Sequence, residues 1–438
     1  MKYQVTIGIA CMVRHTYDVA AAKEIFEAKK KQIKGIENVN WVIIEEPVVE
    51  VVDAEAAAAV FNKNSVDAVV LLSGTFHLGH LVLVFEKLID KPKFLWGFNE
   101  LPYNGGKIRL NTVCAVNLNS SNLYKAGNDT FVCNIGDDMD EAWIDAIRIK
   151  TVLKKAKFGY LGFRAHGFFN LSIDELSHYK DTGVMIDYFD MREGYEQEVS
   201  EDELKESIAH TKKLFVCATL TEDQVEKVSR LTCSLRKFMD KNKLDAVAVR
   251  CWPEYAAQYG ISPCAAMSIL QAEGYILSCE GDIQGAMSML ACKAIGVKSP
   301  YLADLSQIDF ENNFALMWHC GVAPADLWDG ICERSLDTYF AGGKGVTADF
   351  VMKSGMVNAF RIDTARGKTR IFLQKGEAIP MEKLLKGTYA KVVFERNTRE
   401  LIDIVTSTGV AHHVAMAYGD YTQVFKYLSR IMGWEVIQ

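Results

Sequence analysis

The chain has 438 residues, of which 49% are hydrophobic and 24% are charged. This length is too great for one ordinary core, so we expect two or three soluble globular domains. The net charge is −7, and acidic and basic residues are interspersed without a basic tract, which excludes the usual nucleic-acid footprint.

The eleven cysteines stand singly, with no C-x-x-C pair. Single cysteines indicate reduced thiols in a cytoplasmic protein rather than a disulfide or zinc scaffold. The segment that begins Met1-Lys2-Tyr3 leads into a short apolar run, which is typical of a first strand and not of a signal peptide. Since no apolar stretch approaches the roughly 18 residues of a membrane span, no membrane partner is expected.

The first part of the chain alternates strand-like and helical patterns. Strands are predicted at residues 5–13, 41–44, 66–72 and 94–97, and helices at 20–34, 54–62 and 81–89. Such alternation predicts a parallel sheet covered by helices. Residues 1–155 are therefore predicted to form a doubly wound α/β domain, in which Arg14 and His77 lie on loops that follow strands. The chain lacks G-x-G-x-x-G and Gly-Lys-Ser/Thr loops here, so nucleotide binding is not expected.

A second βα series follows and then gives way to a different pattern. Its predicted strands are at 158–162, 184–187, 214–218, 246–249, 276–279 and 301–302. We place a second doubly wound domain at residues 156–310. After it, short alternating strands with little helix between them predict a smaller, β-rich and barrel-like C-terminal domain at residues 311–438. The predicted fold class is α/β.

Two acids stand at the ends of apolar runs, Glu280 and Asp304, 24 positions apart. A strand-helix-strand separation of this length predicts that they lie at equivalent ends of adjacent parallel strands. Carboxylates so close need a cation or a shared proton to offset their repulsion. The alternative is that they cap helices, although Asp282, directly before a predicted helix at 283–294, is the stronger cap.

Histidines supply the remaining candidate metal ligands. His319 ends a third apolar run, where a structural histidine is the alternative interpretation. His412 and His413 lie in a turn-rich segment, and adjacent side chains of an extended chain point in opposite directions. We therefore expect only one of these two to face a cation. Two carboxylates and an imidazole are the donor set of a divalent-metal site.

Two further residues follow predicted strands in this half of the chain. Arg250 could contact a substrate, the alternative being a solvated salt bridge with Glu254. Cys320 stands beside His319 and could also reach a ligand, the alternative being a buried thiol.

These segments resemble a known family. The runs around Glu280, Asp304 and His413, together with Leu95-Trp96-Gly97-Phe98-Asn99, are similar to those of the L-fucose isomerase and L-arabinose isomerase superfamily. The resemblance implies that Glu280, Asp304 and His413 bind a metal, and that His319 adds a ligand as in arabinose isomerases. It also implies that Arg14, Phe76 or His77, and Arg250 lie in regions that contact the sugar. Cys320 and His412 are the other candidates for substrate contact, and His412 stands where the fucose enzymes have an asparagine.

The resemblance implies a Mn²⁺-dependent aldose–ketose isomerase that acts through a cis-enediol, with Mn²⁺ replaceable by another divalent cation. Glu280 and Asp304 would serve as ligands and as the acid/base pair. A trimer or hexamer is expected, with neighbouring subunits contributing to each site. The implied substrate is a hexose or pentose. An anionic 6-deoxy-6-sulfo sugar (sulfoquinovose), a non-catalytic sugar-binding protein and a metal-dependent hydrolase are the alternatives.

Overall fold

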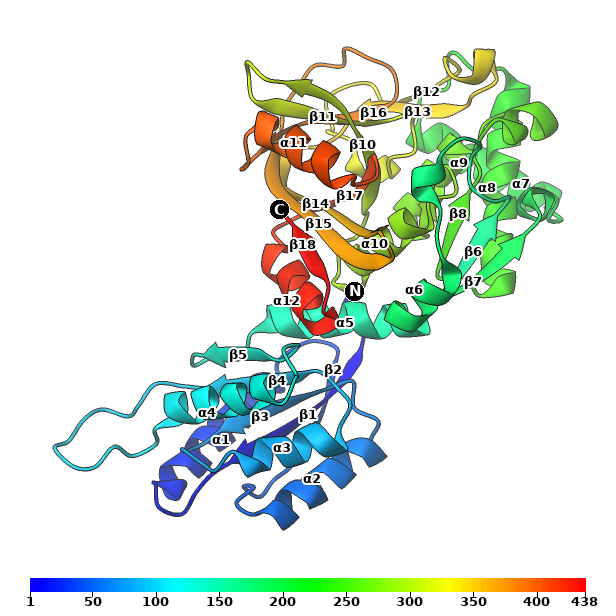
Figure 1. Cartoon of the computed structure of the whole chain (residues 1–438). Helices are drawn as coiled ribbons and strands as arrows, with labels where there is room; N and C mark the ends of the chain where they lie inside the picture. Colours follow the sequence, from blue (N-terminus) through cyan, green and yellow to red (C-terminus); the bar gives the residue numbers. More distant parts are fainter. The chain divides into compact units, whose positions relative to one another are not determined.

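The computed structural model describes residues 1–438 apart from the side chain of residue 341. It divides into two compact units (Figure 1). The first unit consists of Lys2–Thr151 and Gln423–Trp434, and the second consists of Met1, Val152–Thr422 and Glu435–Gln438. Among the described residues, no helix is both long enough and apolar enough to cross a membrane.

The first unit is built on a five-stranded parallel sheet with the order β2-β1-β3-β4-β5. Its strands are β1 (Val5–Met12), β2 (Val39–Ile43), β3 (Ala68–Ser73), β4 (Lys93–Gly97) and β5 (Val132–Ile135). The helices of this part are α1 (Val19–Ile33), α2 (Val51–Lys63), α3 (His80–Leu88), α4 (Thr112–Lys125), α5 (Glu141–Lys155) and α12 (Thr422–Met432). The central strand β3 is buried throughout, as a parallel strand covered on both faces requires. The predicted doubly wound sheet is confirmed.

The second unit contains a four-stranded parallel sheet with the order β7-β6-β8-β9. Its strands are β6 (Lys157–Leu161), β7 (Met185–Phe189), β8 (Ala246–Val249) and β9 (Leu277–Ser278). The helices of this region are α6 (Glu175–Thr182), α7 (Glu201–Leu214), α8 (Glu222–Asn242), α9 (Cys264–Ala272) and α10 (Ile283–Ala294). Short helical turns add η1 (Phe169–Leu171), η2 (Met191–Gly194), η3 (Tyr255–Tyr259) and η4 (Ala325–Leu327). This sheet confirms the second parallel βα series.

The same unit also contains a nine-stranded sheet, with the order β12-β13-β16-β11-β10-β17-β14-β15-β18. Its strands are β10 (Tyr301–Asp309), β11 (Phe314–His319), β12 (Ser335–Asp337), β13 (Thr347–Val351), β14 (Gly355–Ala365), β15 (Lys368–Ile379), β16 (Thr388–Phe394), β17 (His413–Tyr418) and β18 (Glu435–Ile437). Helix α11 (Thr398–Thr408) lies between β16 and β17 in the chain. Because β16 also pairs with β15, six strands from β16 through β11, β10, β17 and β14 to β15 close into a barrel. The predicted barrel-like C-terminal part is confirmed.

One strand lies in a different sheet from the one that the sequence predicts. Residues 301–302 were expected to continue the second parallel series, but β10 pairs antiparallel with β11 and β17 in the barrel. Its burial pattern explains the difference, since the strand is buried only over its first three residues. A strand with one solvent-exposed end suits an antiparallel barrel, whereas a parallel strand covered on both faces is apolar throughout.

One apolar core runs through both sheets of the second unit. It includes Leu235 of α8 and Val247 of β8 on one side, and Met317, Phe350 and Val392 of the barrel on the other. Because this core is continuous, residues from the β9 end and from the barrel can build one site. The first unit has a separate core. The domain limits 1–155, 156–310 and 311–438 stay predictions.

Candidate metal centre

Three neighbouring barrel strands bring the first group of candidate ligands together. Asp304 of β10 lies directly opposite His413 of β17 and opposite Trp318 of β11, the residue before His319. The Nε2 atom of His413 lies 3.4 Å from Oδ1 of Asp304. Each of Asp304, His319 and His413 offers a ligand atom, and these atoms lie within 4.8 Å of one another. The strand register therefore fixes this side of the site.

Glu280 reaches the same site from the turn between β9 and α10. Its backbone is left-handed, with φ of 62°, a conformation that costs an ordinary residue about 1–2 kcal/mol. Gly281 follows, where a Cβ atom would lie 2.5 Å from Cα of Arg164. The amide of Ala165 donates to the carbonyl of Glu280 at 2.9 Å. These contacts hold the turn so that Oε2 of Glu280 lies 3.4 Å from Nε2 of His413.

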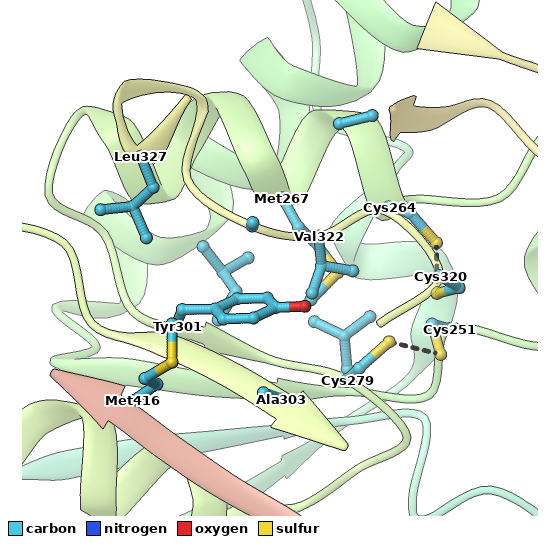
Figure 2. Close-up of a cluster of buried hydrophobic side chains, with 14 of the residues drawn as sticks. Cys251, Cys264, Met267, Cys279, Tyr301, Ala303, Cys320, Val322, Leu327 and Met416 are labelled. Carbon is cyan, nitrogen blue, oxygen red and sulfur yellow. Dashed lines mark hydrogen bonds between the residues drawn. The ribbon is translucent and has the colours of Figure 1, made fainter. Parts of the chain in front are cut away.

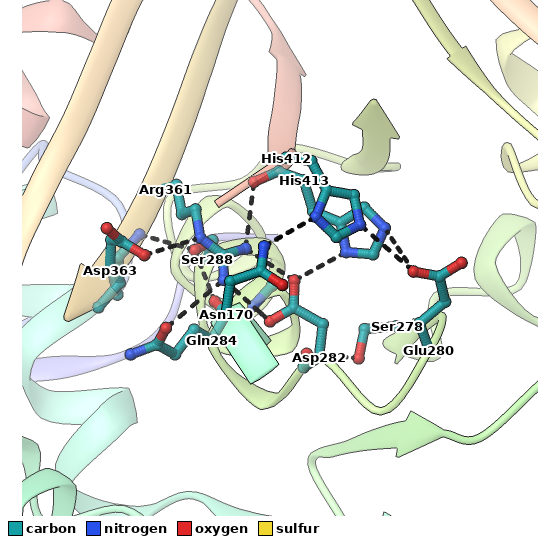
Figure 3. A network of polar contacts seen from close by, with 12 residues as sticks. Asn170, Ser278, Glu280, Asp282, Gln284, Ser288, Arg361, Asp363, His412 and His413 are labelled. Atoms are coloured by element: carbon teal, nitrogen blue, oxygen red, sulfur yellow. Dashed lines mark hydrogen bonds and ion pairs between the residues drawn. The ribbon is translucent and has the colours of Figure 1, made fainter. Parts of the chain in front are cut away.

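Asp282 connects helix α10 to Arg361 and His413 of the barrel (Figure 3). Its carboxylate caps α10 by accepting from the Gly285 amide at 2.8 Å, as the sequence predicts. It also accepts from Nη1 of Arg361 at 2.7 Å and from Nδ1 of His413 at 3.0 Å. Because Nδ1 of His413 donates to a carboxylate, Nε2 keeps a lone pair directed at the site, which is the usual arrangement of a metal-binding histidine.

The charges of this network shift the pKa values of its members. Burial alone would raise the pKa of Asp282, but the Arg361 guanidinium and the His413 hydrogen bond hold it well below its usual range. Burial alone would lower the pKa of His413, but the hydrogen bond to Asp282 and the charges of Asp304 and Glu280 raise it. Burial would raise the pKa of Glu280, and the three histidines lower it. Glu280 is therefore ionised at neutral pH.

His412 also contacts Glu280, with Nε2 3.3 Å from Oε2. Its ring lies 4.2 Å from that of His413 and stacks on Phe168 at 5.3 Å, and Nδ2 of Asn170 donates to its Nδ1 at 3.0 Å. Both histidines therefore lie next to Glu280, and the expectation that only one of them faces a cation stays a prediction. His412 precedes β17, so the alternation of an extended strand does not apply to it.

His319 is oriented differently from His413. The backbone amide of Cys320 donates to Nδ1 of His319 at 2.9 Å. A neutral imidazole that accepts at Nδ1 carries its proton on Nε2. In that tautomer Nε2 is a hydrogen-bond donor that faces the site, not a lone pair that binds a cation.

The residues predicted to contact substrate fall in three places. Arg250 donates to Glu254 through Nε at 2.8 Å, which is the salt bridge weighed as the alternative. Cys320 is buried, with Sγ 3.6 Å from that of Cys264. Arg14 and His77 belong to the first unit, where Arg14 is partly exposed and His77 is buried. Substrate contact by all four residues stays a prediction.

The geometry can be tested for its fit to a cation. Oδ1 of Asp304 and Nε2 of His319 and of His413 are buried and have no hydrogen-bond partner among the described atoms. Leaving a buried polar atom unsatisfied costs about 1–3 kcal/mol. A divalent cation among Glu280, Asp304 and His413 satisfies two acceptors at once, and carboxylate and imidazole donors suit Mn²⁺ and its neighbours. The residues present therefore fit a divalent cation such as Mn²⁺.

Sequence reasoning missed part of what Asp282 does. It identified the cap but not the link from Asp282 to Arg361 and His413. One signal was available, because Arg361 stands between Phe360 and Ile362 inside an apolar strand. A buried arginine requires an acid partner.

Comparison with known proteins agrees with this geometry. Residues 331–438 match the family described as L-fucose isomerase, C-terminal domain. Over 434 residues the chain is 28% identical to the sulfoquinovose isomerases of Priestia megaterium (strain ATCC 12872 / QMB1551) and Priestia aryabhattai, covering 96% of this chain and 96% of each relative. It is 24% identical over 383 residues to the sulfoquinovose isomerase of Alkalicoccus urumqiensis, covering 85% of this chain and 86% of that relative. These similarities support the fucose isomerase-like family for this chain.

Proposed function

We propose that the protein is a Mn²⁺-dependent aldose–ketose isomerase whose substrate is a 6-deoxy-6-sulfo aldohexose, with sulfoquinovose as the first candidate. The observation that carries this proposal is that a carboxylate oxygen of Glu280 and one of Asp304 each lie 3.4 Å from Nε2 of the buried His413, which Asp282 orients. The names of the full-length relatives support the choice of sugar. We also propose that the protein is a homo-oligomer, trimeric or hexameric, in the cytoplasm.

Glu280, Asp304 and His413 would hold the cation. When bound, the cation supplies positive charge that polarises two neighbouring oxygens of the sugar and stabilises negative charge on them. Asp282 keeps the His413 ring in the required tautomer, because its carboxylate accepts the Nδ1 proton. Arg361 in turn holds Asp282 in place through two hydrogen bonds.

The reaction moves a proton from C2 of the aldose to C1 through an enediol. In our proposal one carboxylate of the pair Glu280 and Asp304 accepts the C2 proton and returns it at C1. Glu280 is suited to accept, since its lowered pKa keeps it ionised. Acid/base help of this kind is worth about 10²–10⁴-fold in rate.

His319 takes a different role in this proposal from the fourth-ligand role that the sequence suggests. Its Nε2 proton is available because Nδ1 accepts from the Cys320 amide. The atom is buried and lies in one group with Asp304 and His413. We assign His319 as a donor to a substrate oxygen, on which charge develops in the enediol.

The loop of residues 162–171 is the proposed contact for the sulfonate. Arg164 lies on it, with the guanidinium 4.6 Å from the Phe169 ring centre, and the backbone of the loop is bonded to Glu280 through Ala165. Guanidinium groups bind two oxygens of an anionic group at once through paired N–H donors. By contrast, the guanidinium of Arg250 is already engaged by Glu254.

An aromatic wall next to Glu280 would exclude water from the reacting atoms. The Phe168 ring packs edge-on against Trp252 at 5.9 Å and stacks on His412. The indole Nε1 of Trp252 donates to Oε1 of Glu280 at 3.4 Å. The wall therefore also positions the carboxylate.

The test uses purified protein with Mn²⁺ and a panel of neutral, phosphorylated and sulfonated aldoses, with ketose detected by NMR. We expect ketose from the sulfonated aldohexose and loss of turnover after EDTA treatment. Arg164→Gln should lower kcat/KM for the sulfonated sugar about tenfold or more, as expected for loss of one charge-assisted contact. Its effect on a neutral aldose should be small. Absence of ketose from every sugar in the presence of Mn²⁺ would contradict the proposal.

A further inference from the structure

Four buried cysteines lie close together in the core of the second unit (Figure 2), and one of them, Cys279, directly precedes Glu280 in the sequence. They are Cys251, Cys264, Cys279 and Cys320, each at most 7% exposed. Sγ of Cys279 lies 2.9 Å from that of Cys251, and Sγ of Cys264 lies 3.6 Å from that of Cys320. The thiol of Cys279 also contacts those of Cys264 and Cys320. The pair of Cys251 and Cys279 is closer than ordinary contact between sulfur atoms.

The sulfur atoms of the closer pair lie near enough to form a disulfide. Cys279 directly follows β9 and Cys251 lies two residues after β8, and these two strands pair in parallel with Ala248 opposite Ser278. In this register Val249 would face Cys279, and Cys251 lies two residues further along its strand. Bond formation needs the sulfur atoms to close by only about 0.9 Å, from 2.9 Å to the usual length of about 2.05 Å.

A soft-metal site is the competing interpretation of clustered cysteines. Donor atoms for such a site are present, since Sγ of Cys279, Sγ of Cys320 and a ring nitrogen of His319 lie within 4.8 Å of one another. One argument goes against it. The side chains around them include Met267, Val322 and Leu327 (Figure 2), and such apolar surroundings disfavour the net negative charge of a metal thiolate cluster. A disulfide is neutral.

We propose that Cys251 and Cys279 are a reversible oxidation site, which forms a disulfide with a peroxide and thereby weakens cation binding at the neighbouring metal centre. One sulfur attacks the peroxide O–O bond and becomes a sulfenic acid as the first water leaves. The second thiol then displaces the hydroxyl group as the second water. Two thiols and one hydrogen peroxide give one disulfide and two waters, so two electrons pass from the sulfur atoms to the peroxide.

Both cysteines adjoin groups that hold the Glu280 carboxylate. Cys279 precedes Glu280 in the left-handed turn, and Cys251 precedes Trp252, whose indole donates to Glu280. A closure of about 0.9 Å is several times the roughly 0.2 Å tolerance of a metal–ligand distance. We therefore expect the oxidised protein to bind Mn²⁺ at least about tenfold more weakly. This second half of the inference rests on the proposed function, whereas formation of the disulfide does not.

The experiment treats reduced, metal-free protein with hydrogen peroxide and maps cross-linked peptides under non-reducing conditions after cleavage with a glutamate-specific protease. Cleavage after Glu254 and Glu273 places Cys251 and Cys279 in separate peptides. The expected product is a peptide pair that joins Cys251 to Cys279 and that dithiothreitol separates. Calorimetric titration with Mn²⁺ alone should show weaker binding after oxidation and recovery after reduction. Isomerase activity should fall and recover in parallel.

Variants separate this inference from its alternatives. Cys251→Ala should lose the cross-link and the peroxide sensitivity while keeping Mn²⁺ binding and activity. If the alanine variant does not fold, Cys251→Ser replaces it and should give the same result. Cys292→Ala, a buried cysteine of α10, is the matched control and should keep the cross-link and the sensitivity.

Three outcomes would overturn the inference. Cys251 and Cys279 could stay unlinked while other thiols oxidise, or the link could form with unchanged Mn²⁺ affinity. The third outcome is Zn²⁺ retained by these thiols in the purified protein and protecting them from peroxide. A reduced protein that neither binds Mn²⁺ nor turns over sugar would contradict the proposed function instead, and the peptide map would still decide on the disulfide.

Discussion

His77 and His413 are two fully buried histidines whose pKa values are shifted in opposite directions. His77, in the first unit, contacts Ser73 at 3.2 Å and Asn119 at 3.1 Å, and burial lowers its pKa to about 4. His413, in the second unit, is also 0% exposed, but its carboxylate neighbours outweigh burial and raise its pKa. Partners rather than burial decide what a histidine can do. Among neutral partners the imidazole is structural, and among carboxylates it belongs to a charged site.

The largest expected effect comes from removing the carboxylates around His413. Glu280→Gln and Asp304→Asn keep the size of each side chain but cannot carry the C2 proton. Exchange of the substrate C2 proton with solvent, followed by NMR in D₂O, should fall about 10²–10⁴-fold in each variant. Asp403→Asn, at an exposed position of α11, should leave exchange unchanged. Exchange that persists in both site variants would show that neither carboxylate moves the proton.

The next effect concerns the acid that orients His413. Asp282→Asn leaves the buried guanidinium of Arg361 with Asp363 as its remaining acid partner. Removing one partner of a buried pair costs about 3–5 kcal/mol, measured as the free energy of unfolding in urea. Mn²⁺ affinity should also fall about 10–100-fold, because His413 loses its Nδ1 acceptor.

Asp174→Asn is the matched control for Asp282. Asp174 also caps a helix, α6, by accepting from the Ser177 amide, but it is exposed. This control should cost no more than about 1 kcal/mol. Equal losses in the two variants would mean that Asp282 acts only as a cap.

His77 gives the opposite pH dependence from a histidine paired with acids. Its pKa is about 4 in the folded protein and 6.5 as the ordinary value, so the folded state disfavours the charged form. The part of the unfolding free energy that depends on a neutral His77 is fully present above pH 6.5 and is lost as the pH falls from 6.5 towards 4. The shift corresponds to about 3 kcal/mol of unfolding free energy.

Urea unfolding of the wild type and His77→Gln at pH 7 and pH 4 measures this effect. The wild type should lose about 3 kcal/mol more than the variant, since glutamine does not titrate. An equal loss in both proteins would assign the acid sensitivity to other groups.

These contrasts also show what the sequence predicts and what it does not. Local patterns are sufficient for the parallel sheets, for the Asp282 cap and for the ends of strands at which polar side chains appear. The 24-residue spacing of Glu280 and Asp304 was misinterpreted, because β9 and β10 belong to different sheets. The pairing of Asp304 with His413 depends on barrel closure, which no local period records.

Contacts between residues far apart in the sequence are the least predictable. Arg361 meets Asp282 across 79 residues, and Cys251 meets Cys279 across 28. The residue type indicates that Arg361 has a partner, since a buried arginine needs an acid. Only the packing of the barrel against the β9 turn identifies that partner.

The smallest expected effect distinguishes His319 from His413 within the site. Nδ1 of His319 accepts a hydrogen bond, whereas Nδ1 of His413 donates one, and in our proposal only His413 of these two binds the cation. His319→Leu should leave Mn²⁺ affinity within about threefold, as measured by calorimetry, and should lower kcat/KM about tenfold through loss of one hydrogen bond. His319→Gln, which keeps an N–H donor, should recover part of that loss. His413→Gln should lower Mn²⁺ affinity about 100-fold or more, because a ligand itself is removed. A loss of Mn²⁺ affinity in His319→Leu as large as in His413→Gln would restore His319 as a fourth ligand and require its Nδ1 to turn away from the Cys320 amide when the cation binds.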